Sequence, residues 1–212
     1  MIPPPADAAN ATPMGVSRVV SRGLYKLQHA LHVFEIDAGG LACADLGASV
    51  GGFSQCLLAC GARRIVAVDT AKGILDYAVR RDDRVRTIER ANALHLKPAE
   101  RVDLVVMDLG WTPQRLALPA AARWLGDGGR IVSLIKPHYE SGEHLTSEGE
   151  AERIVQETVA AVAPLGFVCN GLTRSPIAGS RRKGKSAKAG TGNVEWLGLF
   201  EVAQAGDADQ PG

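Results

Sequence analysis

A strand, a glycine-containing turn and a helix are predicted in close succession between Leu41 and Cys60. The segment Leu41–Ala44 is apolar and is followed by Asp45, a pattern typical of a buried parallel strand. The turn contains three glycines: Gly47, Gly51 and Gly52. Apolar residues then recur at helical spacing from Phe53 to Cys60. Together these elements predict the opening unit of an α/β sheet that binds a nucleotide-like ligand at its edge.

The spacing of these glycines favours one class of ligand. A dinucleotide-binding turn requires Gly-x-Gly-x-x-Gly and a P-loop requires Gly-Lys-Ser/Thr, and the chain has neither motif here. Asp45 precedes the first glycine, and its carboxylate would repel a pyrophosphate but could bind an ammonium group. S-adenosylmethionine (SAM), with its amino-acid end, sulfonium and adenosine, fits these requirements. The alternative is an ordinary strand–turn–helix unit that binds no ligand.

The length and composition are those of one globular domain. A chain of 212 residues can bury a sizeable core, and its net charge of +1 means that any nucleic-acid-binding surface must be local. The four cysteines lack a C-x-x-C pair and are expected to be reduced core thiols, with no metal site. The N-terminus lacks the features of a signal peptide and no apolar run reaches membrane-spanning length, so a cytoplasmic protein is expected.

Strands and helices are predicted to alternate along the rest of the chain. Further strands are expected over residues 64–69, 85–89, 102–108, 130–136, 166–172 and 193–200. Helices are expected over residues 21–34, 53–60, 73–80, 113–125 and 146–164. This alternation predicts an α/β domain with a largely parallel sheet.

Acidic residues end three of the predicted strands. Asp69 lies 24 positions after Asp45, near the offset at which a second-strand acid binds a ribose diol. Asp108 ends the strand that begins at Val102, at the same edge of the sheet. Three acids at one edge are costly unless a ligand or cations pair with them, which argues for a site. Asn92 follows another strand, where it could contact an adenine edge or form a turn.

Two lysines and one glutamate need separate consideration. Lys136 ends a buried strand, where a functional role or an ion pair is more plausible than simple solvation. Lys26 lies beside the apolar face of the first helix, and its segment alone favours a solvated side chain. Glu195 lies near the start of the last strand.

The segment 178–192 is the one strongly biased loop. It has no acidic or aromatic residue, and its five cations are Arg181, Arg182, Lys183, Lys185 and Lys188. Such a loop is expected to be flexible and could bind an RNA phosphate backbone, although a plain solvated loop is nearly as compatible with its composition. Residues 1–15 and 205–212 are expected to be disordered tails.

These motifs, in this order, resemble those of the SAM-dependent RNA 2′-O-ribose methyltransferases of the FtsJ/RrmJ type, and they are most similar to the TlyA (hemolysin-like) branch. The resemblance spans roughly residues 16–202. The segments that carry it are Val16–Arg18, Ser21–Leu27, Asp45–Phe53, Ala67–Asp69, Glu89–Asn92, Asp103–Asp108, Leu134–Pro137, Leu165–Phe167, Ser175–Ile177 and Gly192–Glu195.

The resemblance implies a fold and a set of site residues. The fold would be a Rossmann-like methyltransferase domain over residues 16–204, with about seven strands, the last antiparallel, and helices on both faces. The family is similar in having a Lys-Asp-Lys-Glu tetrad, which falls on Lys26, Asp108, Lys136 and Glu195. The residues expected to bind SAM are Asp45, Gly47, Ser49, Gly51, Gly52, Phe53, Asp69, Asn92 and Asp108.

The expected reaction is in-line transfer of a methyl group from SAM to a ribose 2′-hydroxyl of RNA, with ribosomal RNA the expected substrate. Lys136 would activate the hydroxyl, as a general base when neutral or by stabilising developing negative charge when protonated. The alternatives are methylation of a small molecule and a non-catalytic SAM-binding ribosome-assembly factor.

Two departures from the family bear on the substrate. TlyA proteins typically begin with an S4-type RNA-binding module, whereas this chain begins with a short Pro-rich tail, so a partner protein in place of that module is one expectation. The family's Asp-Val-Ser-Phe after the fourth strand is Asp108-Leu-Gly-Trp111 here, which changes the rim beside the acceptor.

Overall fold

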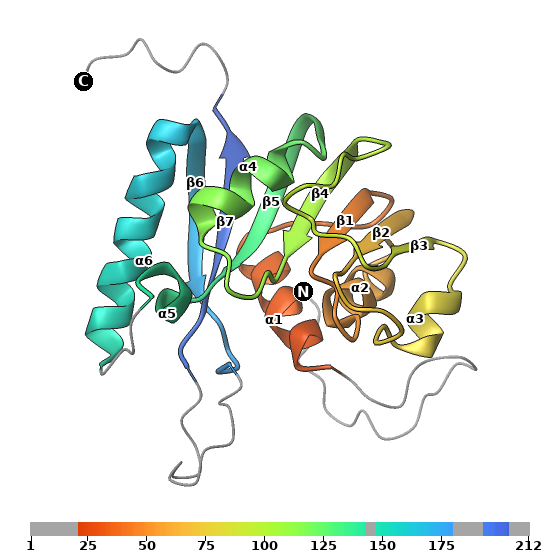
Figure 1. Ribbon diagram of the computed structural model, residues 1–212, viewed down its shortest axis with the longest axis horizontal. Coiled ribbons are helices and arrows are strands. Elements are labelled where there is room, and N and C mark those ends of the chain that lie inside the picture. The colour runs from red at the N-terminus through yellow and green to blue at the C-terminus, as the bar shows by residue number, and fades with distance from the viewer. Residues whose placement is uncertain (1–20, 143–146, 180–192, 204–212) are drawn as a thin grey trace, which may run out of the picture.

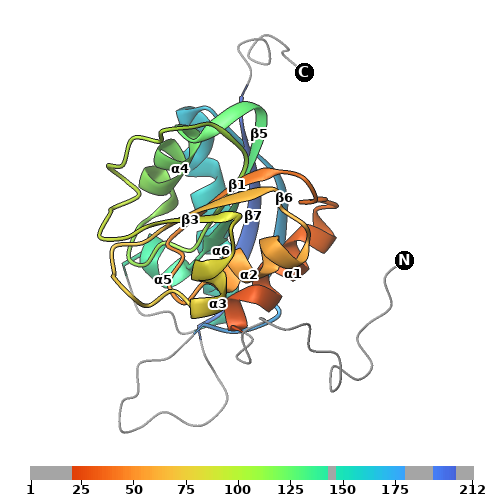
Figure 2. The same ribbon diagram turned by 90° about the vertical axis from the view of Figure 1, so that its right-hand side faces the viewer.

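The computed structural model of the protein describes residues 21–142, 147–179 and 193–203. The two predicted tails and the five cations of the basic loop lie outside these ranges. Across the described ranges, no helix has both the length and the apolar character needed to cross a bilayer. The elements that are described form a single mixed sheet with helices packed on both faces (Figure 1 and Figure 2).

The sheet has seven strands in the order β3-β2-β1-β4-β5-β7-β6, which confirms the predicted methyltransferase fold. Its strands are β1 (Ala42–Leu46), β2 (Arg64–Val68), β3 (Val85–Ile88), β4 (Val102–Met107), β5 (Leu125–Ile135), β6 (Phe167–Arg174) and β7 (Trp196–Val202). The first five strands are parallel to one another, and β7 lies antiparallel between β5 and β6. All five parallel strands therefore end at the same edge of the sheet.

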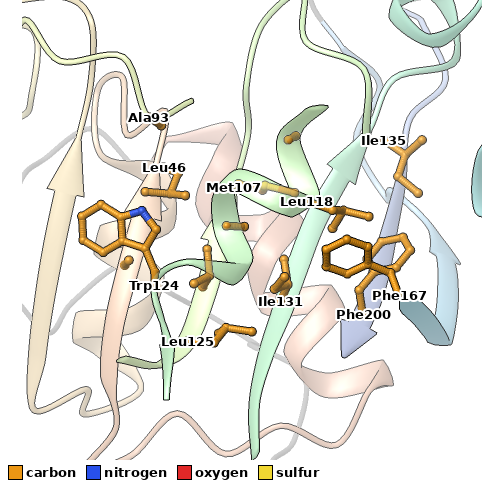
Figure 3. Packing of buried hydrophobic residues seen from close by; sticks show 14 of the residues in the cluster. Leu46, Ala93, Met107, Leu118, Trp124, Leu125, Ile131, Ile135, Phe167 and Phe200 are labelled. Carbon is orange, nitrogen blue, oxygen red and sulfur yellow. The ribbon is translucent and has the colours of Figure 1, made fainter. Parts of the chain in front are cut away.

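The helices divide between the two faces. They are α1 (Arg22–Val33), α2 (Gly52–Ala59), α3 (Tyr77–Arg81), α4 (Gln114–Ala122), α5 (Pro137–Glu140) and α6 (Glu148–Val162). One core cluster joins α1 and α2 to the sheet and includes Leu27, Leu57 and Leu104. The other joins α4 and α6 to the opposite face and includes Leu118 and Trp124 (Figure 3). The central strands are largely apolar because both of their faces are covered.

Some element boundaries differ from the predictions. The helix predicted at residue 73 begins at Tyr77, because Asp76 Oδ1 accepts a hydrogen bond from Ala78 N at 2.9 Å and caps it there. The strand predicted to begin at residue 130 begins at Leu125, and the pairing register of this longer strand with β4 shifts near its start. The single-turn helix α5, which directly follows Lys136, was not predicted.

All four cysteines are free thiols. Cys43 and Cys56 are buried, as expected for core thiols, whereas Cys60 is exposed because it follows the last turn of α2 at the surface. Cys169 is partly buried on β6. The prediction of core thiols therefore holds for the first two and is wrong for Cys60.

Asp45 is buried within β1 and does not emerge at the edge of the sheet. The strand continues through Leu46, and the exposed fraction of Asp45 is 1%. Its Oδ2 accepts hydrogen bonds from Ser54 N at 2.9 Å and from Ser54 Oγ at 2.6 Å, whereas Oδ1 has no hydrogen-bond partner. Burial raises the pKa of the Asp45 carboxyl from 3.8 to about 7, against the lowering effect of the Ser54 hydrogen bonds.

The contact between α1 and α2 leaves no room for a side chain at Gly52. A Cβ atom at this position would lie 2.5 Å from Ser21 Oγ and 2.9 Å from the Cα of Gly23. Ser21 cannot move aside without losing a hydrogen bond, because its Oγ caps α1 by accepting a hydrogen bond from Gly23 N. The close approach of the two helices therefore requires glycine at position 52.

The Asp45→Asn variant is expected to gain stability relative to the wild type as the pH rises. Because the pKa of Asp45 is higher in the folded protein than in the unfolded chain, the folded state binds the proton more tightly. The free energy of unfolding of the wild type therefore declines between about pH 4 and about pH 7, by up to ~4 kcal/mol at about 1.4 kcal/mol per pKa unit. Asparagine does not titrate. Urea unfolding of both proteins across this range measures the difference, and parallel pH profiles would contradict it.

The Gly52→Ala variant is expected to lower the free energy of unfolding by about 1–3 kcal/mol, because the added methyl group must push α1 away from α2. Gly149→Ala is the matched control, since a Cβ atom on that helical residue meets nothing within 4 Å. The control is expected to raise stability by about 0.4–1 kcal/mol through helix propensity. Urea unfolding compares the two variants, and an unchanged stability of Gly52→Ala would show that the helices are not tightly fixed.

Candidate active site

A cavity of about 420 Å³ lies beyond the carboxyl ends of the parallel strands. Its wall includes five of the predicted cofactor residues, namely Gly47, Ser49, Asp69, Asn92 and Asp108, together with the predicted catalytic Lys136. The wall also contains residues that were not predicted, among them Thr70, Leu94, Leu109 and Thr112. Each of these follows closely on a residue that was predicted from a strand end, which is the signal that could have found them.

The turn after β1 is held tightly against its neighbours. Gly47 has a positive φ of 86°, and a Cβ atom there would lie 2.6 Å from the backbone oxygen of Asp108. Gly47 N also donates to the Val68 carbonyl at the end of β2, at 2.9 Å. Glycine is therefore required because the turn passes between the ends of β2 and β4 with no space for a side chain.

Asp69 organises the next part of the wall. Its Oδ2 accepts a hydrogen bond from Ser49 N at 2.7 Å, and its Oδ1 accepts one from Ala71 N at 2.7 Å. Ser49 adopts a φ of 51°, which turns its N–H toward the carboxylate. Each carboxylate oxygen can accept a further hydrogen bond, so Asp69 can hold the β1 turn and still accept hydroxyl groups from a ribose.

Asn92 acts as the turn-forming residue that was one of its two predicted roles. Its Oδ1 accepts a hydrogen bond from Leu94 N at 2.9 Å, the geometry of an Asx turn. Because Asn92 also lines the cavity, a ligand there can use the side-chain NH2 group as a donor without breaking the turn.

Four predicted cofactor residues lie outside the cavity wall: Asp45, Gly51, Gly52 and Phe53. Phe53 is buried in the core beneath α1, with an exposed fraction of 4%, and Asp45 is buried within its strand. Gly51 has a positive φ of 94°, and a Cβ atom there would lie 2.9 Å from Leu75 Cδ1. In the structure, these residues shape and support the turn from behind.

Asp108 and Lys136 form an ion pair at the mouth of the cavity. Asp108 directly follows β4 and Lys136 directly follows β5, so the parallel register of these strands brings both to the same edge. The exposed fractions of their side chains are 31% and 13%, so a ligand in the cavity can reach both.

Lys26 and Glu195 form a second ion pair, which is buried. Their side chains are 6% and 5% exposed, and neither residue lines the cavity. Ile135 pairs with Trp196 in the antiparallel ladder of β5 and β7, so Lys136 and Glu195 occupy opposed positions just beyond it. The structure thus brings the four predicted tetrad residues together as two neighbouring ion pairs.

An aromatic pair, the exposed Trp111 and the partly buried Tyr139, borders the Asp108–Lys136 ion pair. Trp111 is 76% exposed, has a φ of 57°, and stacks on Tyr139 with a distance of 4.5 Å between ring centroids. The Tyr139 ring centroid in turn lies 5.3 Å from Lys136 Nζ. Trp111 thus lies between two residues that line the cavity, Gly110 and Thr112, without lining it itself, and its place beside an acceptor stays a prediction.

The residues present fit SAM as a ligand. The acceptor oxygens of Asp69 and the donor NH2 of Asn92 suit an adenosine, and Gly47 allows close approach to the backbone. Among the described residues Oδ1 of Asp45 has no hydrogen-bond partner, but this side chain is buried behind the turn and does not line the cavity. Over the described residues, no three His, Cys, Asp or Glu side chains come together as a metal site.

Comparison with known proteins is consistent with this geometry. The model of the FtsJ-like methyltransferase family matches residues 19–179. The 16S/23S rRNA (cytidine-2′-O)-methyltransferase TlyA of Mycobacterium tuberculosis is 38% identical over 188 residues, which cover 84% of this chain and 66% of that protein. Hemolysin A of Brachyspira hyodysenteriae is 31% identical over 196 residues, which cover 87% of this chain and 78% of that protein.

A solved structure of a protein described as a hemolysin from Streptococcus thermophilus superimposes with a TM-score of 0.78 at 33% identity, covering 90% of this chain and 70% of that one. The chain spans about two thirds of the length of the TlyA protein it matches. The match to the family model extends from α1 through β6 and includes Lys26, Asp108 and Lys136. The chain belongs to the FtsJ-like methyltransferase family.

Proposed function

We propose that the protein transfers a methyl group from SAM to the 2′-hydroxyl of a cytidine in ribosomal RNA. The observation that carries this proposal is the meeting of Lys26–Glu195 and Asp108–Lys136 at the strand edge beside the cavity. The TlyA relatives, which are named for cytidine 2′-O-methylation of ribosomal RNA, support the choice of acceptor. A ribosomal RNA substrate would place the protein in the cytoplasm.

When bound, SAM supplies a methyl group that is already activated by its sulfonium. The residues of the chain then have to bind, orient and deprotonate the acceptor. Asp69, Asn92 and the turn at Gly47 would hold the adenosine half of the cofactor. Asp108 and Lys136, at the mouth of the same cavity, would lie between the cofactor and the acceptor ribose.

Lys136 is the residue proposed to act on the 2′-hydroxyl. Its Nζ is paired with the carboxylate of Asp108 in the wall of the cavity, where it would meet the hydroxyl of a bound acceptor. Lys136 could accept that proton or stabilise negative charge on the oxygen, and both roles require its amino group at this position. Glu195 of the buried Lys26–Glu195 pair is opposed to Lys136 in the continued register of β5 and β7, and the pair would orient Lys136 and the acceptor.

The RNA itself would be bound in part by the basic loop, whose cations could contact several phosphates. A partner protein that helps to present the RNA would be an addition to this surface.

Labelled methyl transfer to deproteinised ribosomal RNA and to intact ribosomal subunits, followed by nucleoside identification, tests the proposal. A 2′-O-methylcytidine product supports it. Label in a small molecule, or SAM binding without any transfer, would contradict it.

Lys136→Ala is expected to lower kcat for RNA methylation by roughly 10²–10⁴-fold, because proton removal and charge stabilisation are both lost. The affinity for SAM, measured by calorimetry, is expected to change little. Lys97→Ala is the matched control, since Lys97 is an exposed lysine outside the cavity wall, and it should retain full activity. Wild-type rates in Lys136→Ala would show that the catalytic assignment is wrong.

Replacing Arg181, Arg182, Lys183, Lys185 and Lys188 by serine is expected to weaken RNA binding and reduce its dependence on salt. For single-stranded RNA, each phosphate contact contributes about 0.7 to the slope of log K against log salt concentration, so losing five contacts would reduce the slope by about 3.5. Fluorescence anisotropy over a range of salt concentrations measures this slope. An unchanged slope, with unchanged SAM affinity as the folding control, would show that the loop does not contact phosphates.

A further inference from the structure

Two chain segments carry the residues of the Asp108–Lys136 ion pair, and they contact each other at three places. One segment runs from Asp108 to Gln114, at the start of α4, and the other runs from Lys136 to Glu140 through α5. The first contact is the Asp108–Lys136 ion pair, and the second is the stacking of the Trp111 and Tyr139 rings. The third contact joins Gln114 to Glu140 at the far end of both segments.

The third contact is a cap supplied to α4 by another element. The N-cap residue of α4, Pro113, makes no side-chain capping hydrogen bond. Instead, both carboxylate oxygens of Glu140 accept the hydrogen bond of Gln114 N, at 3.0 and 3.1 Å. A carboxylate at a helix N-terminus is stabilised by the helix dipole as well as by the hydrogen bond.

Gln114 is held in place by side-chain hydrogen bonds to β5, so its contact with Glu140 also fixes the position of Glu140. Its side chain is 3% exposed and bridges to β5, because Gln114 Nε2 donates to the Leu134 carbonyl at 3.2 Å and Oε1 accepts from Ser133 Oγ at 2.7 Å. These two residues immediately precede the end of β5. Glu140 is therefore attached, through Gln114, to the strand from which Lys136 emerges.

The helix α5 depends on this attachment. It has four residues, and its internal hydrogen bonds run from Tyr139 N and Glu140 N to the Lys136 carbonyl. One helical turn is not stable by itself and needs tertiary contacts to persist. Lys136 is the N-cap residue of this turn, so a change in the path of α5 changes the direction in which its side chain leaves the backbone.

We propose that Glu140 is a positioning residue of the methyltransferase site, which keeps Lys136 directed at Asp108 by fixing the single-turn helix α5 to the N-terminus of α4. This inference rests on the proposed methyl transfer to RNA. Glu140 does not line the cavity and touches neither the cofactor site nor the acceptor site. Its action on the reaction is through the backbone that carries Lys136.

The charge of Glu140 depends on pH in the range in which the enzyme would work. Burial raises the pKa of Glu140 from 4.5 to about 7, while the hydrogen bond from Gln114 N and the charge of Arg115 lower it. The charged groups around it are Arg115 of α4 and Glu157 of α6, which line the same 210 Å³ cavity, and His138 within α5. The carboxylate form, which caps α4 most strongly, therefore predominates only above about pH 7.

Kinetics of Glu140→Ala and Glu140→Gln test the proposal. Glu140→Ala is expected to lower kcat roughly tenfold or more, with little change in the KM for RNA or in SAM affinity, because only the placement of Lys136 is disturbed. Glu140→Gln retains one acceptor and should lose less. The ratio of wild-type kcat to that of Glu140→Gln is expected to rise as the pH increases through about 7. Glu157→Gln, which alters another acidic residue of the same cavity, is the control and should behave as wild type.

A second measurement does not depend on catalysis. The rate at which an amine-reactive reagent modifies Lys136, followed by mass spectrometry, is expected to rise roughly threefold in Glu140→Ala as the ion pair with Asp108 loosens. Lys26, buried against Glu195, is the internal control and should stay protected.

Equal labelling of Lys136 in wild type and Glu140→Ala would overturn the positioning role, as would a flat pH ratio. A loss of stability that weakens SAM binding and exposes Lys26 in parallel would also overturn it, in favour of a general structural role. A wild-type protein that methylates no RNA would contradict the proposed function, and the labelling result would still decide whether Glu140 positions Lys136.

Discussion

The buried ion pair between Lys26 and Glu195 joins the first helix of the described chain to the residue that precedes its last strand, across 169 positions of sequence. Removing two charges from water is costly, and a well-packed apolar pair at the same place would be at least as stable. The pair is therefore hard to explain by stability alone. It does fix the position of α1 against the start of β7, where Glu195 is opposed to Lys136 in the continued register with β5.

The topology of the sheet explains how such distant residues come to lie at one edge. The carboxyl ends of β4 and β5 meet at one edge because these strands are parallel, and this brings Asp108 beside Lys136. The antiparallel strand β7 begins where β5 ends, so Glu195, which precedes it, reaches the same edge from the opposite chain direction. A parallel last strand would place its first residue at the other edge of the sheet. The reversed strand is thus the feature that completes the site.

The sequence predicts the strands of this fold well, because parallel strands covered on both faces have nearly continuous apolar runs, as in the segments 64–69 and 102–108. It could not predict α5, since a four-residue helix has too few residues to show a helical period. The burial of Asp45 was also missed, because one more residue of strand, Leu46, decides whether a polar side chain emerges at the edge. The two ion pairs depend on contacts between distant segments, which local sequence does not show. The segment around Lys26 therefore favoured a solvated side chain, and only the family resemblance indicated that Lys26 belongs to the tetrad.

Two helices that border the site are capped in the same unusual way. The N-cap residues of α2 and α4 are Gly51 and Pro113, and neither makes a side-chain capping hydrogen bond. The N–H groups of their first turns are instead satisfied by carboxylates from other elements, Asp45 for α2 and Glu140 for α4.

A side chain at Gly51 would collide with Leu75, so the turn that approaches the ligand cannot supply its own cap. The cap of α2 comes instead from Asp45, which is buried behind this turn. Burial raises the pKa of both capping carboxyl groups, those of Asp45 and Glu140, to about 7. The geometry that opens the backbone to a ligand therefore makes the charge of both caps dependent on pH, because burial favours the neutral carboxyl groups whereas the hydrogen bonds from Ser54 and Gln114 favour the carboxylates.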